Sequence, residues 1–460
     1  MKTLNFLQRG YAAARKSALF GALVAATGVL GMFSDTAQAV PSMARQTGMQ
    51  CAACHTVFPE LTSFGRQFKL RAFSLSVPKE KSSDSMFGDV PISALLQVSR
   101  TTTKNASTPG AEPEQFPRDR ETIVQAAGLY YGGKITDKSG ALVQYFYDGI
   151  EKKWATEMFD VRWADTASAF GGKEVVYGVT LSNNPTTTDI YNGTPMWSFP
   201  HTETPALMSN AQAATDMRLA GRVGGPGMYA MWNNLLYGEL ALYRTTKTGV
   251  FRPLGWGVEK DDLVRGTAPY WRVAVQRDLG SHFFQVGAYG LSARIYTDAA
   301  DQSLGTDRFR DFAIDGEYHY SAGDHLVSVH ATRIREKQKL DGAFATGLAS
   351  NPTNTLRTTR ADVHYWYKRT IGGGFGVFST TGSEDQMRYN MGEAVHGSIA
   401  GSPNTRGWML DLNYLPVQNV KLALRYTSYS EFNGAGTNYD GFGRNATDNN
   451  SLHLLGWFLF

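Results

Sequence analysis

The chain has 460 residues, two cysteines and a formal net charge of +4. Residues 1–39 hold four basic side chains and one acid, so they account for +3 of that charge and leave about +1 for the rest of the chain. The sequence pI of about 8.8 is therefore no argument for binding nucleic acid, which would need a strongly basic mature chain.

The first 39 residues have the pattern of a secretory signal peptide. Four basic residues precede a stretch of apolar or small residues over 17–33, and Ala37-Gln38-Ala39 offers small residues for cleavage. An uncleaved membrane helix is the alternative, but the stretch is shorter than the roughly 20 residues that a span requires and contains three glycines. We therefore expect residues 1–39 to be a signal peptide.

Both cysteines lie in the pentapeptide Cys51-Ala52-Ala53-Cys54-His55, which has the spacing of a c-type haem attachment site. Each thiol can add to one vinyl group of a haem, and the adjacent imidazole then lies beside the iron as its proximal ligand. A thioredoxin-like dithiol gives no role to His55, and structural zinc needs two further ligands that no other cysteine supplies. The pentapeptide predicts one covalently attached c-type haem in a small segment over residues 40–81.

Residues 82–460 alternate between apolar and polar side chains in short segments. Over residues 309–320, for example, Phe312 and Ile314 share one face of an extended strand while Asp315 and His319 share the other. Such segments begin near residues 92, 122, 141, 157, 174, 214, 235, 269, 283, 309, 325, 357, 374, 406, 420 and 450. Short turns follow the even-numbered segments and long loops follow odd-numbered ones. The fold expected is all-β, an outer-membrane antiparallel barrel of about 16 strands.

A soluble β-sandwich is the alternative, because one face of a sandwich strand is also polar. Loop lengths that alternate over so many strands favour the barrel, and Phe460 ends the last segment as in the sorting signal of such barrels. In hydrocarbon the first and last strands must pair, since an open edge would be unsatisfied. An even strand number then puts both barrel ends, and with them the haem segment, on the periplasmic side of the outer membrane. We expect that segment to plug the lumen.

The sixth ligand of the haem iron is not defined by the motif. A methionine would raise the haem potential, and Met43, Met49 and Met86 lie near the motif or shortly after the segment. His319, His330 and His364 fall on the charged faces of three consecutive expected strands and could converge in the lumen, although a lumenal histidine is more often a solvated side chain. The candidates for the distal ligand of the haem iron are Met49, Met86, His330 and His364.

Other polar residues permit two interpretations. One group could serve the haem propionates or could hold the segment to the barrel wall: Arg45, Gln46, Thr47, Arg66 and Lys69. A second group of acids could capture iron in the surface loops or could simply be solvated: Asp298, Asp301, Asp307, Glu384 and Asp385.

The haem flank resembles the fused outer-membrane monohaem cytochrome-porins that oxidise ferrous iron at the cell surface. The likeness covers some thirty residues, from Ala44-Arg45-Gln46-Thr47-Gly48 through the pentapeptide to Pro59, Leu61-Thr62, Phe64-Gly65-Arg66 and Phe68-Lys69. The stretch Asn183-Asn184-Pro185-Thr186, followed by Trp197, Phe199 and Pro200, is also similar to that family.

This resemblance implies an iron:cytochrome c oxidoreductase. Extracellular Fe(II) would give one electron to the haem, which would pass it to a periplasmic cytochrome c, and no acid-base catalyst is needed for such outer-sphere transfer. Two alternatives stay open: a general extracellular electron conduit with another donor or acceptor, and a porin plugged by a haem. Haem uptake is disfavoured because a covalently attached haem cannot be delivered. The oligomeric state is not indicated by the sequence.

Overall fold

The computed structural model describes residues 41–57, 60–76, 90–105, 119–149, 152–169, 171–186, 188–192, 211–245, 262–390, 392–417 and 419–460. All of them belong to one compact unit, Gln38–Phe460. The signal peptide expected over residues 1–39 lies outside the described residues.

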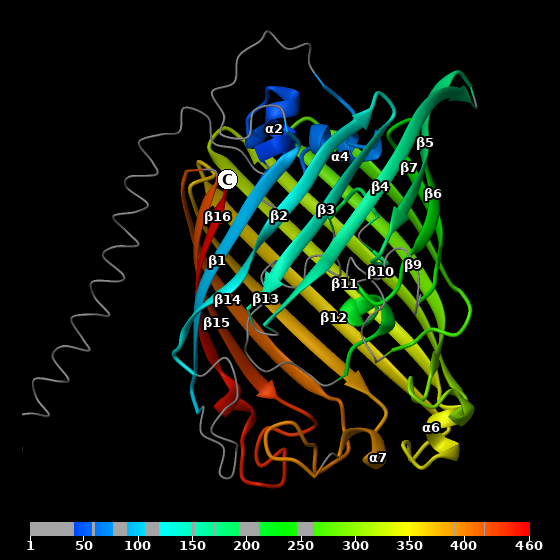
Figure 1. Cartoon of the computed structure of the whole chain (residues 1–460). Coiled ribbons are helices and arrows are strands. Elements are labelled where there is room, and N and C mark those ends of the chain that lie inside the picture. The colour runs from blue at the N-terminus through cyan, green and yellow to red at the C-terminus, as the bar shows by residue number, and fades with distance from the viewer. Residues whose placement is uncertain are drawn as a thin grey trace, which may run out of the picture. The chain divides into compact units, whose positions relative to one another are not determined.

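Sixteen antiparallel strands close into a barrel in which each strand pairs with its neighbours in sequence (Figure 1). The strands are β1 (Ile92–Thr103), β2 (Thr122–Thr136), β3 (Ser139–Asp148), β4 (Lys153–Ala169), β5 (Lys173–Ser182), β6 (Gly225–Trp232), β7 (Leu236–Tyr243), β8 (Ala268–Leu279), β9 (His282–Tyr296), β10 (Thr306–Ala322), β11 (His325–Lys339), β12 (Thr353–Tyr367), β13 (Ile371–Gly382), β14 (Thr405–Val417), β15 (Val420–Glu431) and β16 (Ser451–Leu459). β1 closes on β16, with Leu95 opposite Leu459 and Thr103 opposite Ser451. The expected strand count and closure are confirmed.

Side chains alternate between the two faces of the barrel as the sequence predicts. On β10 the apolar Phe312 and Ile314 are about half exposed on the outer wall, while Asp315, Glu317 and His319 are buried inside. Apolar side chains can face hydrocarbon without cost, and every strand finds hydrogen-bond partners on both sides because the sheet is closed. The protein is a multi-pass β-barrel of the bacterial outer-membrane type.

The expected sixth strand is displaced along the chain. The alternation suggested a strand from about residue 214, but β6 begins at Gly225, and Ala214–Arg218 forms a π-helical turn, η2. Met217 has a φ of 70°, which ends any extended or helical backbone there. The prediction was wrong because the backbone of this turn bonds to acids on the inner wall, with Ala214 N donating to Glu336 and Thr215 N to Asp311.

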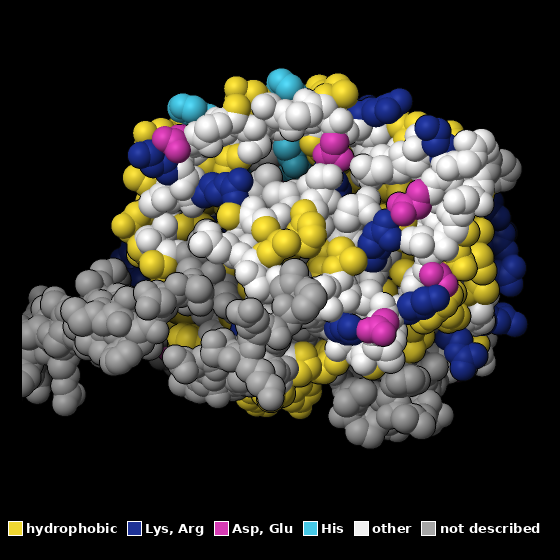
Figure 2. Space-filling view, turned by 90° about the horizontal axis from the view of Figure 1, so that it is seen from above, with side chains coloured by type: hydrophobic (Ala, Val, Ile, Leu, Met, Phe, Trp, Pro, Cys, Tyr) yellow, Lys and Arg dark blue, Asp and Glu magenta, His cyan; other side chains and the backbone are white. Residues whose placement is uncertain are grey.

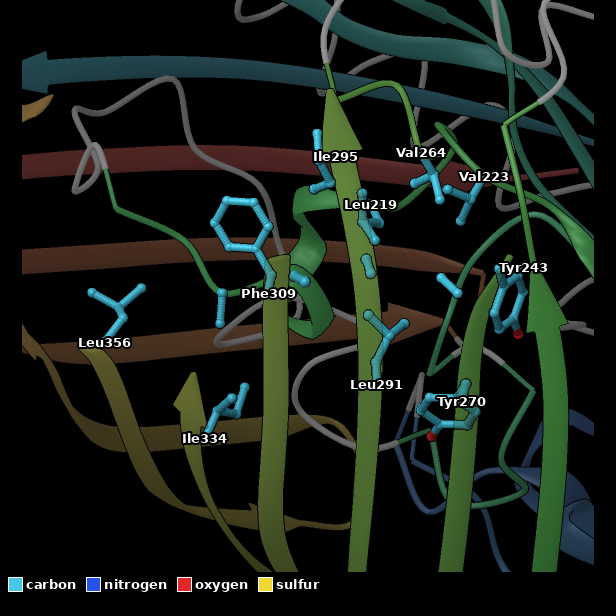
Figure 3. Packing of buried hydrophobic residues seen from close by; sticks show 14 of the residues in the cluster. Leu219, Val223, Tyr243, Val264, Tyr270, Leu291, Ile295, Phe309, Ile334 and Leu356 are labelled. Carbon is cyan, nitrogen blue, oxygen red and sulfur yellow. The ribbon is translucent and has the colours of Figure 1, made fainter. Parts of the chain in front are cut away.

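The turn η2 and the residues beside it occupy part of the lumen. Leu219 and Val223 pack against inward-facing side chains of β7–β12, including Tyr270, Leu291 and Phe309 (Figure 3). Asp216 accepts two hydrogen bonds from Arg360 of β12, at 2.6 and 3.0 Å. The described part of the lumen on this side is therefore packed with side chains.

Three short helices lie at the end of the barrel where the short turns are: α2 (Pro41–Thr47), α3 (Cys51–Cys54) and α4 (Ser63–Leu70) (Figure 1). We call residues 41–76 the N-terminal segment. Hydrogen bonds join it to the ends of three hairpins: Arg66 to Asp278, Gln67 to Asn234, and Ala52 O to Arg369. Leu70 and Ala72 belong to a buried cluster with inward-facing residues of β4–β9. The segment thus lies against the barrel wall at the short-turn mouth of the lumen.

The rim of this mouth is charged. Ion pairs there include Arg71–Glu174, Lys138–Asp165 and Lys368–Asp324. Figure 2 views this end and shows basic and acidic side chains lying next to one another on it.

The other helices among the described residues follow other strands: η4 (Gln302–Leu304), α6 (Asp341–Ala345), α7 (Gln386–Tyr389) and η5 (Ala446–Asn449). None of the described helices has both the length and the apolar character that a membrane crossing requires.

Ile314 provides a test of the outer wall. It lies on β10 between the outward-facing Arg310 and Tyr318, so we expect it near the bilayer midplane. Ile314→Arg should lower the free energy of unfolding by about 2–4 kcal/mol, whereas Leu279→Arg, at the end of β8 beside a short turn, should cost about 0–1 kcal/mol. Urea titration of the barrel refolded in lipid vesicles measures both. Equal costs at the two positions would contradict this placement of the membrane.

Candidate functional site

A cavity lies between the N-terminal segment and the barrel wall. It encloses about 750 Å³ when the space open to solvent is counted. The lining residues are Met43, Ala44, Thr47, Met49, Gln50, Cys51, Cys54, His55, Leu61, Gly65, Phe68, Lys69 and Phe73 from the segment, and Tyr130, Leu142, Gln144 and Asn192 from the rest of the chain. The structure therefore brings Cys51, Cys54 and His55 to one mostly apolar cavity.

Local sequence sets the arrangement of the helices around the cavity. Gly48, with a φ of 63°, follows the end of α2, where a left-handed residue commonly stops a helix. Thr62 is the N-cap of α4, since its hydroxyl accepts from Gly65 N at 3.1 Å. The same hydroxyl donates to Ala53 O, and so ties α4 to α3.

Gly65 is where the two helices come closest. A β-carbon at this position would lie 2.1 Å from the carbonyl oxygen of Cys54, a backbone atom that cannot move aside alone. Glycine is needed here because any side chain would push α4 away from α3 and open the cavity.

The imidazole of His55 is oriented by its own loop. The backbone N–H of His55 donates to Cys51 O at 2.8 Å, and its Nδ1 lies 3.2 Å from Glu60 O. A hydrogen bond from Nδ1 to a carbonyl fixes the ring and its tautomer, which presents Nε2 as the coordinating nitrogen.

Burial changes the acid–base character of two groups at the cavity. It raises the pKa of the Cys54 thiol to about 11, so the thiol is neutral at physiological pH. Burial, with Arg162 nearby, lowers the pKa of Lys69 to about 8, although Lys69 donates to Asn192 Oδ1 at 2.9 Å. An anionic group in the cavity would be stabilised by this buried ammonium.

These residues fit a c-type haem. Two thiols and an imidazole reach the cavity from one stretch of chain, as covalent attachment and proximal ligation require. Phe68, Phe73 and Leu142 provide apolar walls, and Lys69 provides a cation for a carboxylate. A covalently attached haem in this cavity stays a prediction.

The proposed propionate ligands divide between the two interpretations. Lys69 and Thr47 line the cavity. The other three hold the segment to its surroundings: Arg45 donates to Val90 O and Ile92 O, Gln46 bonds to Phe73 O, Leu75 O and Lys134 N, and Arg66 donates to Leu61 O and Asp278.

The distal candidates are placed differently from one another. Met49 lines the cavity, as does Met43, whose side chain also packs against an apolar cluster of the wall that includes Tyr130 and Leu455. His330 and His364 are not among the lining residues described above. Met86 lies outside the described residues.

The three lumenal histidines do converge, but at a second place beneath the segment. His319 Nε2 and His330 Nε2 are 3.4 Å apart, and Asp362 Oδ1 lies 2.9 Å from His330 Nδ1 and 3.2 Å from His364 Nδ1. Glu60 connects this cluster to the segment, because its Oε1 accepts from Ser328 Oγ at 2.6 Å and lies 3.9 Å from His330 Nε2. We call Glu60, Glu317, His319, His330 and Asp362 the lumenal cluster.

Sequence reasoning missed three members of this cluster, Glu60, Glu317 and Asp362, and Glu317 precedes His319 by two residues on the same strand face. Asp362 precedes His364 by two residues and so shares its strand face, a signal that the alternation already contained. Glu60 gave no such signal, since its neighbours depend on how the segment is seated in the barrel.

The loop acids considered for iron capture have structural partners where these are described. Asp385 is the N-cap of α7 and also accepts from Ser350 N and Asn354. Asp307 accepts from Gly342 N and Ala343 N, and Asp301 caps η4.

Comparison with known proteins gives only distant structural likenesses. No protein-family model and no curated protein sequence matches the chain. OmpF of Salmonella typhi, in complex with daunomycin, is similar at a TM-score of 0.43 and 10% identity, over 80% of this chain and 97% of that one. The outer membrane channel DcaP of Acinetobacter baumannii gives 0.42 and 9%, over 80% and 96%, and an anion-selective porin from Comamonas acidovorans gives 0.42 and 11%, over 80% and 98%. The fold follows from the strand order of this chain and does not depend on these likenesses.

Gly65 tests the geometry of the cavity. Gly65→Ala should displace α4 from α3, so that protease cleaves the N-terminal segment at least several-fold faster while the barrel strands stay protected. Gly238→Ala is the matched control, because a β-carbon there meets no atom within 4 Å. Limited proteolysis followed by mass spectrometry measures the effect. Cleavage of the segment at the same rate in both variants would contradict the packing described.

Proposed function

We propose that this protein carries electrons across the bacterial outer membrane through one covalently attached c-type haem, accepting them from extracellular Fe(II) and passing them to a periplasmic cytochrome c. The observation that carries the proposal is the meeting of Cys51, Cys54 and His55 in one apolar cavity at the mouth of a membrane barrel. The resemblance of the haem flank to iron-oxidising cytochrome-porins supplies the donor.

A bound haem would supply one-electron redox chemistry, and the residues of this chain would set where and how readily it occurs. Cys51 and Cys54 would hold it by thioether bonds, each formed by adding S–H across a vinyl double bond. His55, kept in orientation by Glu60 O, would be the proximal ligand. Lys69 would pair with a propionate, which offsets the cost of burying its ammonium.

The contents of the lumen favour a conduit over an open pore. The N-terminal segment packs against inward-facing residues of β4–β9 at the short-turn mouth, and η2 with its apolar neighbours packs against the inner wall of β7–β12. A diffusion channel needs a continuous polar passage, whereas electron transfer needs only a rigid scaffold that holds the redox centre. We therefore prefer electron transfer to a haem-plugged porin.

Anaerobic stopped-flow spectroscopy tests the proposal. Fe(II) mixed with the detergent-solubilised holoprotein should reduce the haem rapidly, as seen in the Soret and α bands. Full reduction by dithionite together with no reduction by Fe(II) would exclude Fe(II) as donor. A Cys51→Ser and Cys54→Ser double variant should carry no covalent haem on a denaturing gel, while Ser63→Ala, at the exposed start of α4, should keep it.

We propose Met49 as the distal ligand. It lines the cavity from the coil after α2, while Met43 is engaged in packing against the wall. Met49→Leu should abolish the methionine-to-iron band in near-infrared magnetic circular dichroism and lower the haem potential, because loss of a thioether ligand destabilises the reduced state. Met43→Leu should keep the band. A band that survives in Met49→Leu and is lost in Met43→Leu would assign the ligand to Met43, and a spectrum without the band in the wild type would exclude both.

A further inference from the structure

We propose that Glu317, His319 and His330 form a binding site for a divalent first-row metal ion inside the barrel, separate from the haem cavity. One nitrogen from each histidine and one carboxylate oxygen lie within 4.8 Å of one another, and all three residues are at least nine-tenths buried. They come from two neighbouring strands, β10 and β11, in which Glu317 and His330 are directly opposite.

The spacing of the two imidazoles matches metal coordination. Their Nε2 atoms are 3.4 Å apart. Two nitrogens at 2.0–2.1 Å from a tetrahedral ion are separated by about 3.4 Å. Glu317 Oε2 lies 3.9 Å from His319 Nε2, a separation that two ligands of one ion can have at bond lengths of about 2.0–2.2 Å. Two histidines and one carboxylate are a ligand set that suits Fe(II) and Zn(II).

Two further observations point to a ligand at this place. Oε1 of Glu317 is buried and has no hydrogen-bond partner among the residues that the structure describes, which is costly unless a cation meets it. Asp362 accepts from His330 Nδ1 at 2.9 Å and thereby directs Nε2 toward the site. A carboxylate that orients a histidine from behind is typical of metal-ligating imidazoles.

The site lies next to the proximal haem ligand. Glu60 accepts from His55 with its backbone oxygen and approaches His330 Nε2 with its side chain, so one residue separates the two centres. Resting on the proposed function, we infer that Fe(II) is the ion that this site takes. Metal binding itself requires no electron transfer and is testable without it.

The experiment is isothermal titration of the detergent-solubilised holoprotein with Co(II), a probe that does not readily reduce the haem. Wild type should bind one equivalent. Glu317→Gln and His319→Asn, which keep size and polarity, should each weaken binding at least tenfold, and Asp362→Asn should weaken it by about 10–100-fold. His453→Asn is the matched control and should bind as wild type, because His453 is buried on β16 beside Thr101. Circular dichroism checks that each variant is folded.

The outcomes separate this site from the proposed function. Equal Co(II) binding by wild type, Glu317→Gln and His319→Asn would overturn the site, as would no binding by folded wild type, whether or not Fe(II) reduces the haem. One equivalent bound by wild type and lost in both variants supports the site even if stopped-flow mixing shows no reduction. A selective drop in the rate of haem reduction by Fe(II) in Glu317→Gln, with unchanged reduction by dithionite, would connect the two.

Discussion

Closure of β1 on β16 is the constraint on which the rest of the structure depends. Backbone groups at an open sheet edge would be unsatisfied in hydrocarbon, so the first and last strands must pair. Because the strand number is even, the chain enters and leaves the barrel at the same end, the end with the short turns. The strand topology alone therefore places the N-terminal segment at that mouth, whatever specific contacts it makes there.

Specific contacts then hold the segment in place. It is too short to build a core of its own, and segments of this size usually depend on a cofactor or on a neighbouring structure. Here the barrel supplies the missing surface: Arg66 pairs with Asp278 and stacks on Phe283, while Tyr229 donates to Leu70 O. Packing of the segment on the barrel also places Glu60 beside Ser328 and His330, so the same contacts that stabilise the segment bring the two candidate centres together.

Much of this arrangement could be predicted from the sequence. The strand positions could be predicted because alternating apolar and charged residues fit a membrane only as barrel strands with the charges facing the lumen. For example, β10 begins at Thr306 where a start near residue 309 was expected. The convergence of His319 and His330 was accessible for the same reason, since both lie on inward faces of neighbouring strands. The turn η2 could not be predicted from the sequence. Its residues alternate as in a strand, and its conformation depends on Asp311 and Glu336, which lie on strands distant in the sequence. The placement of Glu60 likewise required the tertiary structure.

Transfer of electrons across a sealed membrane tests the central claim most directly. Lipid vesicles would contain oxidised cytochrome c, carry the barrel in their membrane and receive Fe(II) only from outside. The account predicts that the trapped cytochrome is reduced at a rate that rises with the number of wild-type barrels and falls to background with the Cys51→Ser and Cys54→Ser double variant. Equal reduction with the double variant would mean that iron leaks through the barrel, and no reduction with the holoprotein would mean that no electrons cross; either result would contradict the account.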